Sequence, residues 1–112
     1  PFPRALALAG KNIRNEETGE IKGADTETVA ENTWVNHGLV NGENVHIRAN
    51  HITNENTGRI YGTRLSVEAD TLDNLGTYKK KAPVIASREH MNLFITDTLT
   101  NTEHALSVPK ET

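Results

Sequence analysis

Cysteine is absent from this chain of 112 residues. A chain without thiols has no disulfide framework, no thiolate metal site and no thiol nucleophile. Aromatic residues make up only 4% of the sequence, and no apolar run approaches the roughly 20 residues that a membrane-spanning helix needs. We therefore expect the fold to be stabilised by aliphatic packing and backbone hydrogen bonds, with no segment that inserts into a membrane.

Neither sign of charge dominates, since 12 Lys and Arg residues are interspersed with 15 Asp and Glu residues. A nucleic-acid partner requires a basic surface, so none is expected. The composition does not change along the chain, which predicts one structural unit over residues 1–112. The Pro1-Phe2-Pro3 start and the Val108-Pro109-Lys110 end resemble cuts within a longer chain, in which any export signal would lie outside this segment.

The apolar residues that predominate are Leu, Ile and Val, accompanied by an excess of Asn, Thr and Gly. No window shows the i, i+3, i+4, i+7 spacing of an amphipathic helix. β-branched residues favour strands, while Asn and Gly favour turns. The sequence therefore predicts an all-β fold.

An internal repeat of about 20 residues organises the chain. Each unit contains an apolar-x-apolar strand, a corner with a small residue, an apolar-x-Asn strand, a turn, and a Gly-x-apolar-x-Gly strand. The first of these strands recurs as Leu6-x-Leu8, Thr26-x-Thr28, Val45-x-Ile47, Leu65-x-Val67 and Met91-x-Leu93. Alternate side chains of a strand point to opposite faces, so each pattern directs its apolar residues inward.

Short inward strands that recur at this period are typical of stacked coils. We predict a right-handed parallel β-helix, or solenoid, of about five coils of about 20 residues. The residues expected to point inward are Leu8, Ile13, Ile21, Val40, Ile47, Ile52, Ile60, Val67 and Leu72.

The asparagines of the repeat are predicted to form a structural ladder, in which side-chain amides of successive coils bond to one another and tolerate left-handed backbone. Its members are Asn15, Asn36, Asn54, Asn74 and Asn101. Sharp turns are expected at Gly19, Gly38, Gly58 and Gly76, and tight corners at Gly10, Ala30, Ala49 and Ala69.

Two spacings are one residue longer than their counterparts, Thr28 to Asn36 and Met91 to Leu99. We interpret each extra residue as a β-bulge. The spacing also expands around Tyr78-Lys79-Lys80-Lys81-Ala82-Pro83, which predicts a projecting loop at residues 78–87.

The repeat resembles the haemagglutinin-repeat region of two-partner-secretion exoproteins, the family of filamentous haemagglutinin and of contact-dependent growth-inhibition effectors. The segment Ala82 to Glu89, and its continuation from Leu99 to Leu106, is the part most similar to that family. The resemblance implies export through an outer-membrane β-barrel transporter, a secreted or bacterial cell-surface location, and a long rod. Adjacent coils of the parent exoprotein would be its structural partners, and a host or target-cell receptor or glycan would be a further partner.

No catalytic, cofactor-binding or metal-binding residue is predicted, and no cofactor is implied. The histidines do not cluster by motif: they are His37, His46, His51, His90 and His104. The expected outward rows, Ala7-Glu27-His46-Ser66-Asn92 and Ala9-Val29-Arg48-Glu68, place no two acids on adjacent coils of one row, as a β-helical hydrolase or lyase would need. Arg48 and Glu68 are expected to lie side by side as an exposed pair.

The leading hypothesis is thus a non-enzymatic rod or stalk segment that displays an adhesive or toxin-delivery region to other cells. The alternative is a carbohydrate-active or carbohydrate-binding β-helix domain. Receptor binding by the loop at residues 78–87, which carries three lysines and Tyr78, is a third possibility. Trp34 is expected to fill the core.

Overall fold

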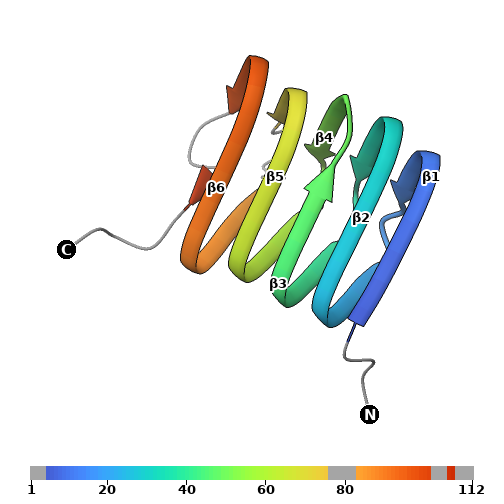
Figure 1. The fold of residues 1–112 in the computed structure, drawn as a ribbon, viewed down its shortest axis with the longest axis vertical. Coiled ribbons are helices and arrows are strands. Elements are labelled where there is room, and N and C mark those ends of the chain that lie inside the picture. The colour runs from blue at the N-terminus through green and yellow to red at the C-terminus, as the bar shows by residue number, and fades with distance from the viewer. Residues whose placement is uncertain (1–4, 76–82, 102–105, 108–112) are drawn as a thin grey trace.

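A computed structural model describes residues 5–75, 83–101 and 106–107, with side-chain burial described up to residue 101. All its regular elements are strands (Figure 1): β1 (Ala5–Asn15), β2 (Glu20–Asn36), β3 (Leu39–Arg48), β4 (His51–Glu55), β5 (Arg59–Leu75), β6 (Val84–Asn101) and β7 (Leu106–Ser107). Within these residues there is no helix long and apolar enough to cross a membrane.

Parallel pairing links the strands into a stack of coils. The order β1-β2-β3-β5-β6-β7 runs through hydrogen-bonded neighbours, and β4 pairs with β2 and β5. Figure 1 shows the strands bending round and lying side by side as successive turns. The sequence-based prediction of an all-β, parallel β-helix is confirmed.

Three strand positions recur in every complete coil, and we name them faces 1, 2 and 3 in chain order. Face 1 stacks Ile21, Val40, Ile60, Ile85 and Leu106. Face 2 stacks Leu6, Thr26, Val45, Leu65 and Met91, and face 3 stacks Ile13, Trp34, Ile52, Leu72 and Leu99. Long strands such as β5 cover all three faces because the chain bends without leaving the sheet.

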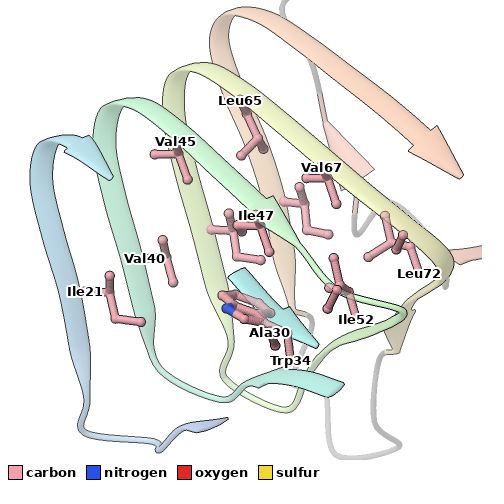
Figure 2. Packing of buried hydrophobic residues seen from close by; sticks show 14 residues of the cluster. Ile21, Ala30, Trp34, Val40, Val45, Ile47, Ile52, Leu65, Val67 and Leu72 are labelled. Carbon is pink, nitrogen blue, oxygen red and sulfur yellow. The ribbon is translucent and has the colours of Figure 1, made fainter. Parts of the chain in front are cut away.

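The core is the aliphatic column enclosed by the three faces (Figure 2). Inward residues are buried while their chain neighbours face outward, as period-two alternation requires. Of the predicted inward residues, all from Ile21 to Leu72 are buried. Trp34 is also fully buried, so it does fill the core.

The first coil departs from this pattern of burial. Ile13 packs against the core but is only partly buried, and Leu8 is 39% exposed although its backbone pairs with Thr28 in the expected register. Among the described residues, β1 has a coil on one side only, so its inward side chains are covered on one side.

Both β-bulges expected from the spacing are present. The extra residue of β2 lies opposite the step from Gly10 to Asn12 in β1, and the extra residue of β6 lies opposite the step from Ala69 to Thr71 in β5. A third irregularity lies between Gly62 and Arg64, opposite Ser87 to His90. The spacing of the repeat does not predict this third irregularity, because Ser87 stands where the preceding coils have the glycine that ends the face-1 pattern.

The predicted projecting loop at residues 78–87 is wrong at its C-terminal end. Val84 begins β6, and Ile85 is buried opposite Ile60 on face 1. Residues 78–82 lie outside the described residues. The amide of Val84 donates to the carbonyl of Gly58, so Pro83, not Gly76, follows Gly19, Gly38 and Gly58 in the stack. Gly76, at which the sequence predicts a sharp turn, lies outside the described residues.

The turn glycines are needed for space and not for left-handed backbone. No described glycine has positive φ, and the non-glycine residue with positive φ is Asn56, at 59°. A Cβ atom built on Gly38 would lie 2.3 Å from the Glu16 carbonyl oxygen, closer than any real contact. The left-handed backbone that the sequence allowed for the ladder asparagines is likewise not used there.

Candidate functional site

A line of side-chain amides follows face 3 from the first coil to the last, buried at Asn15, Asn36, Asn54 and Asn74 and exposed at Asn101. Asn15 donates through Nδ2 to Asn36 Oδ1 at 2.8 Å, and Asn36 donates in the same way to Asn54 at 2.9 Å. The line continues from Asn54 to Asn74 at 2.9 Å and from Asn74 to Asn101 at 3.1 Å. These are the five asparagines that the sequence placed in the ladder.

Ladder asparagines also hold the turns that lead to the next coil. The Nδ2 of Asn36 lies 2.9 Å from the carbonyl oxygen of Gly38, two residues on, and that of Asn54 lies 3.3 Å from Gly58, four residues on. Asn74 reaches Pro83 at 3.4 Å, nine residues on. One side-chain contact thus accommodates turns of very different length, because it fixes the end of the turn and not its path.

On the outer surface of face 2, His46 lies between two carboxylates from neighbouring coils. Its Nε2 is 2.6 Å from Glu68 Oε2, and its Nδ1 is 3.4 Å from Glu27 Oε2. Glu27 and His46 are register partners, whereas Glu68 lies diagonally, two residues beyond the partner of His46, Ser66. Comparing residues along single rows could not reveal this group, although counting diagonal neighbours would have found it.

The register of Arg48 and Glu68 is as expected, since the two are paired across β3 and β5. The contact made by Glu68 differs from the expected one, because its carboxylate bonds to His46 instead. A long arginine side chain on an exposed strand has many rotamers, and the shorter imidazole reaches the same carboxylate at a lower entropic cost.

The His46 group has limited chemical scope as it stands. A catalytic imidazole must offer one ring nitrogen to a substrate proton at hydrogen-bond distance. Here each ring nitrogen already faces a carboxylate, and the side chain of His46 is 34% exposed. The arrangement ties three coils together on the surface and would need one carboxylate to move before the ring could act on a substrate.

The remaining histidines are dispersed. His37 Nε2 lies 2.8 Å from Glu55 Oε2 at the turn, and His51 Nδ1 lies 2.8 Å from Thr71 Oγ1 on face 3. His90 is exposed on face 2, and His104 lies outside the described residues. Within the part of the chain that the structure describes, no three His, Asp or Glu side chains are grouped so as to hold a metal ion.

An open groove of about 580 Å³ runs beside His46 across successive coils. It is lined by three neighbouring rows of face 2, including Asp25, Arg64 and His90. Asn44 bridges the first two of these, accepting from Arg64 at 3.5 Å and donating to Asp25 at 2.7 Å. The groove has charges of both signs, so its electrostatics select no single class of ligand.

The predicted receptor-binding loop is outside the described residues at Tyr78, Lys79, Lys80 and Lys81. Tyr61 faces outward on face 1 and is half-buried between Asn41 and Ala86. It therefore forms no aromatic platform with its register partners.

The chain matches no protein-family model, and the comparisons with curated proteins and with solved structures likewise find no match.

Proposed function

We propose that this chain is a structural rod or stalk segment of a large secreted bacterial surface exoprotein, in which the rod displays an adhesive or toxin-delivery region to other cells. The observation that carries the proposal is the equivalence of the coils. The same three faces, the same buried rows and the same amide ladder recur from coil to coil. A structure of this kind extends by repetition, which suits it to span a distance.

The proposal takes its cellular setting from the resemblance of the repeat to haemagglutinin repeats. In that setting, the partners are the adjacent coils of the parent exoprotein, an outer-membrane transporter during export, and a receptor or glycan of the target cell that another region of the parent contacts. The location is the bacterial surface or the medium.

Tandem duplication of Leu39–Gly58 tests whether the coils are modular. The duplicated segment would follow Gly58, so that its first residue takes the place of Arg59, which is the register partner of Leu39. We expect a folded protein that is about 4.8 Å longer by small-angle scattering, with a larger free energy of unfolding and a larger denaturant m-value. A scrambled insert of the same composition is the control. A duplication that changes the length, the free energy of unfolding and the m-value no more than the scrambled insert does would contradict the rod proposal.

A carbohydrate-binding or carbohydrate-active domain remains the second candidate, and the groove beside Glu27 and His46 is the observation in its favour. Polysaccharide turnover and glycan binding should be compared between the unchanged chain, Glu27→Gln and Thr53→Ser, a control on another face. Binding or turnover that Glu27→Gln abolishes and Thr53→Ser preserves would favour this candidate over the rod.

A further inference from the structure

His46 contacts the coils on both sides of it through its two ring nitrogens. Its Nε2 lies 2.6 Å from Glu68 Oε2, and its Nδ1 lies 3.4 Å from Glu27 Oε2. A neutral imidazole has one N–H donor and one acceptor, whereas the protonated ring has two donors. Because each ring nitrogen faces a carboxylate oxygen, only the protonated ring can donate to both neighbouring coils.

The other charged groups that face His46 are of both signs. Asp25 of β2 and Arg64 of β5 lie diagonally from it, and both bond to Asn44. Arg48 lies two residues further along β3. The arginines disfavour a proton on the ring, while Asp25 favours one. Since Coulomb interactions weaken with distance and are screened by salt, the two carboxylates in contact with the ring decide the balance.

A second histidine joins the turns of two successive coils. His37 Nε2 lies 2.8 Å from Glu55 Oε2, and the side chain of His37 is only 13% exposed. Its backbone is held from both sides, because its amide donates to the Asn15 carbonyl and its carbonyl accepts from the Thr57 hydroxyl, each at 2.8 Å. The ring therefore meets the carboxylate with little further loss of conformational entropy.

Acidic groups also predominate around His37. Glu16 and Glu17 belong to the turn of the preceding coil, directly after the residue that accepts the His37 amide, and Glu16 pairs with Arg14. Arg59 begins β5, and its amide donates to the carbonyl of the residue after His37. A proton on this ring thus has a carboxylate in direct contact and further carboxylates in the adjoining turn.

From these contacts we propose that His46 and His37 form a pH-sensitive clasp, which ties the second, third and fourth coils together more tightly as the surroundings become mildly acidic. His46 joins all three coils on face 2, through Glu27 of β2 and Glu68 of β5. His37 joins the turns that follow the second and third coils. The clasp lies in the interior of the stack, so it does not depend on what adjoins either end.

The direction of the effect follows from proton linkage. A folded chain that stabilises the protonated rings binds more protons than the unfolded chain in the range where histidine titrates, about pH 5–8. The free energy of unfolding therefore rises as the pH falls through this range, and this contribution is lost as the pH rises. Near about pH 4 the carboxylates gain protons as well, and the contribution of the clasp disappears.

Urea unfolding at about pH 7.5 and about pH 5.5 tests the proposal. In the unchanged chain, the equilibrium constant for unfolding should be smaller at the lower pH. His46→Gln and His37→Gln should each reduce the ratio between the two constants about two- to fivefold, the effect of one exposed or half-buried ion pair, and the double variant should remove most of it. His51→Gln is the matched control, because its ring bonds to the uncharged Thr71 hydroxyl.

Variants of the carboxylates separate the clasp from a purely structural role of the rings. Glu68→Gln and Glu55→Gln keep the imidazoles and remove the charges that they face, so each should reduce the ratio as the matching histidine variant does. Glu43→Gln, at an exposed position of β3, is the control. Comparing variants cancels the titration of the histidines that are left in place.

A ratio that the double histidine variant retains in full would overturn the proposal, and so would controls that reduce it as much as the clasp variants. The test is independent of the coil duplication, which concerns modularity and uses one pH. A chain that accepts a duplicated coil and shows no effect of the clasp variants on the ratio would keep the rod and lose the clasp.

Discussion

At the residue scale, single inward positions carry the stability of the coils. Ile52 is fully buried on face 3, where it is the register partner of both Trp34 and Leu72. Its chain neighbours His51 and Thr53 face outward. The alternation of roles between adjacent residues makes matched substitutions informative.

Ile52→Asp should prevent folding, because an unpaired charge in an apolar column costs several kcal/mol against a total stability of about 5–15 kcal/mol. His51→Asp is the matched control, and its exposed position predicts a change within about 0.5 kcal/mol. Circular dichroism and urea unfolding of both variants provide the measurement. A cooperatively folding Ile52→Asp protein would show that the inward assignment is wrong.

Burial also distinguishes the members of the ladder. The side chain of Asn54 is fully buried and contacts Asn36, Asn74 and two carbonyl oxygens, those of Gly58 and Val84. Asn101 is exposed at the end of the line. A ladder position therefore matters in proportion to the number of partners that it leaves without a bond.

Asn54→Ala should lower the free energy of unfolding by about 2–4 kcal/mol, since buried amide and carbonyl groups lose their partners at about 1–3 kcal/mol each. Asn101→Ala should cost about 0.5 kcal/mol or less. Denaturant unfolding measures both. Equal effects at the two positions would contradict the view that buried ladder bonds stabilise the stack.

At the element scale, corners and strands respond differently to a change in length. The corner between faces 2 and 3 contains one residue in the third and fourth coils, Asn50 and Asp70, and two in the second, Glu31 and Asn32. In the second coil, the corner residue Asn32 has no register partner in β1. Its removal therefore leaves the inward rows in register, whereas a residue removed from a strand turns the following side chains to the other face.

Deletion of Asn32 should therefore be tolerated, with a change in stability of about 1 kcal/mol or less. Deletion of Thr53 should abolish folding, because it would place Asn54 where Thr53 now faces outward. Resistance to proteolysis and urea unfolding compare the two variants. If the Asn32 deletion were as damaging as the Thr53 deletion, the bulge would be an essential part of the strand and not a spacer.

At the scale of the whole molecule, burial falls from the middle of the stack towards its ends. Ile47, Ile52 and Leu72 are fully buried, while Leu8 and Leu99 are 39% and 44% exposed. In a stack where each coil contacts only its neighbours, stability is a sum of coil and interface contributions, so an end coil has one interface and a middle coil has two.

Amide hydrogen exchange should follow this gradient. We expect the slowest exchange in β3, β4 and the adjoining part of β5, and faster exchange in β1 and in the part of β6 from His90 to Asn101, because coils with one interface open locally at lower free energy. Uniform protection from β1 to β6 would mean that the chain unfolds only as a whole, which would contradict additive coils.

The repeat in the sequence was sufficient to predict the fold and the ladder. Alternation of apolar and polar residues determines the inward rows, and the recurring Asn determines where coils align, so the stacking of Ile13, Trp34, Ile52 and Leu72 followed from spacing alone. These features depend on backbone geometry, which is local and repeats at every coil.

Only the tertiary structure decided the features that depend on choices between neighbours in space. Glu68 bonds to His46 diagonally and not to Arg48 beside it, and Pro83 takes the stack position after Gly58. The first choice is made by side-chain rotamers on an open surface, and the second by where the chain rejoins the sheet at Pro83, nine residues after Asn74. Neither is determined by the period of a strand, because long side chains and long turns reach several partners at similar free energy and only the assembled coils select among them.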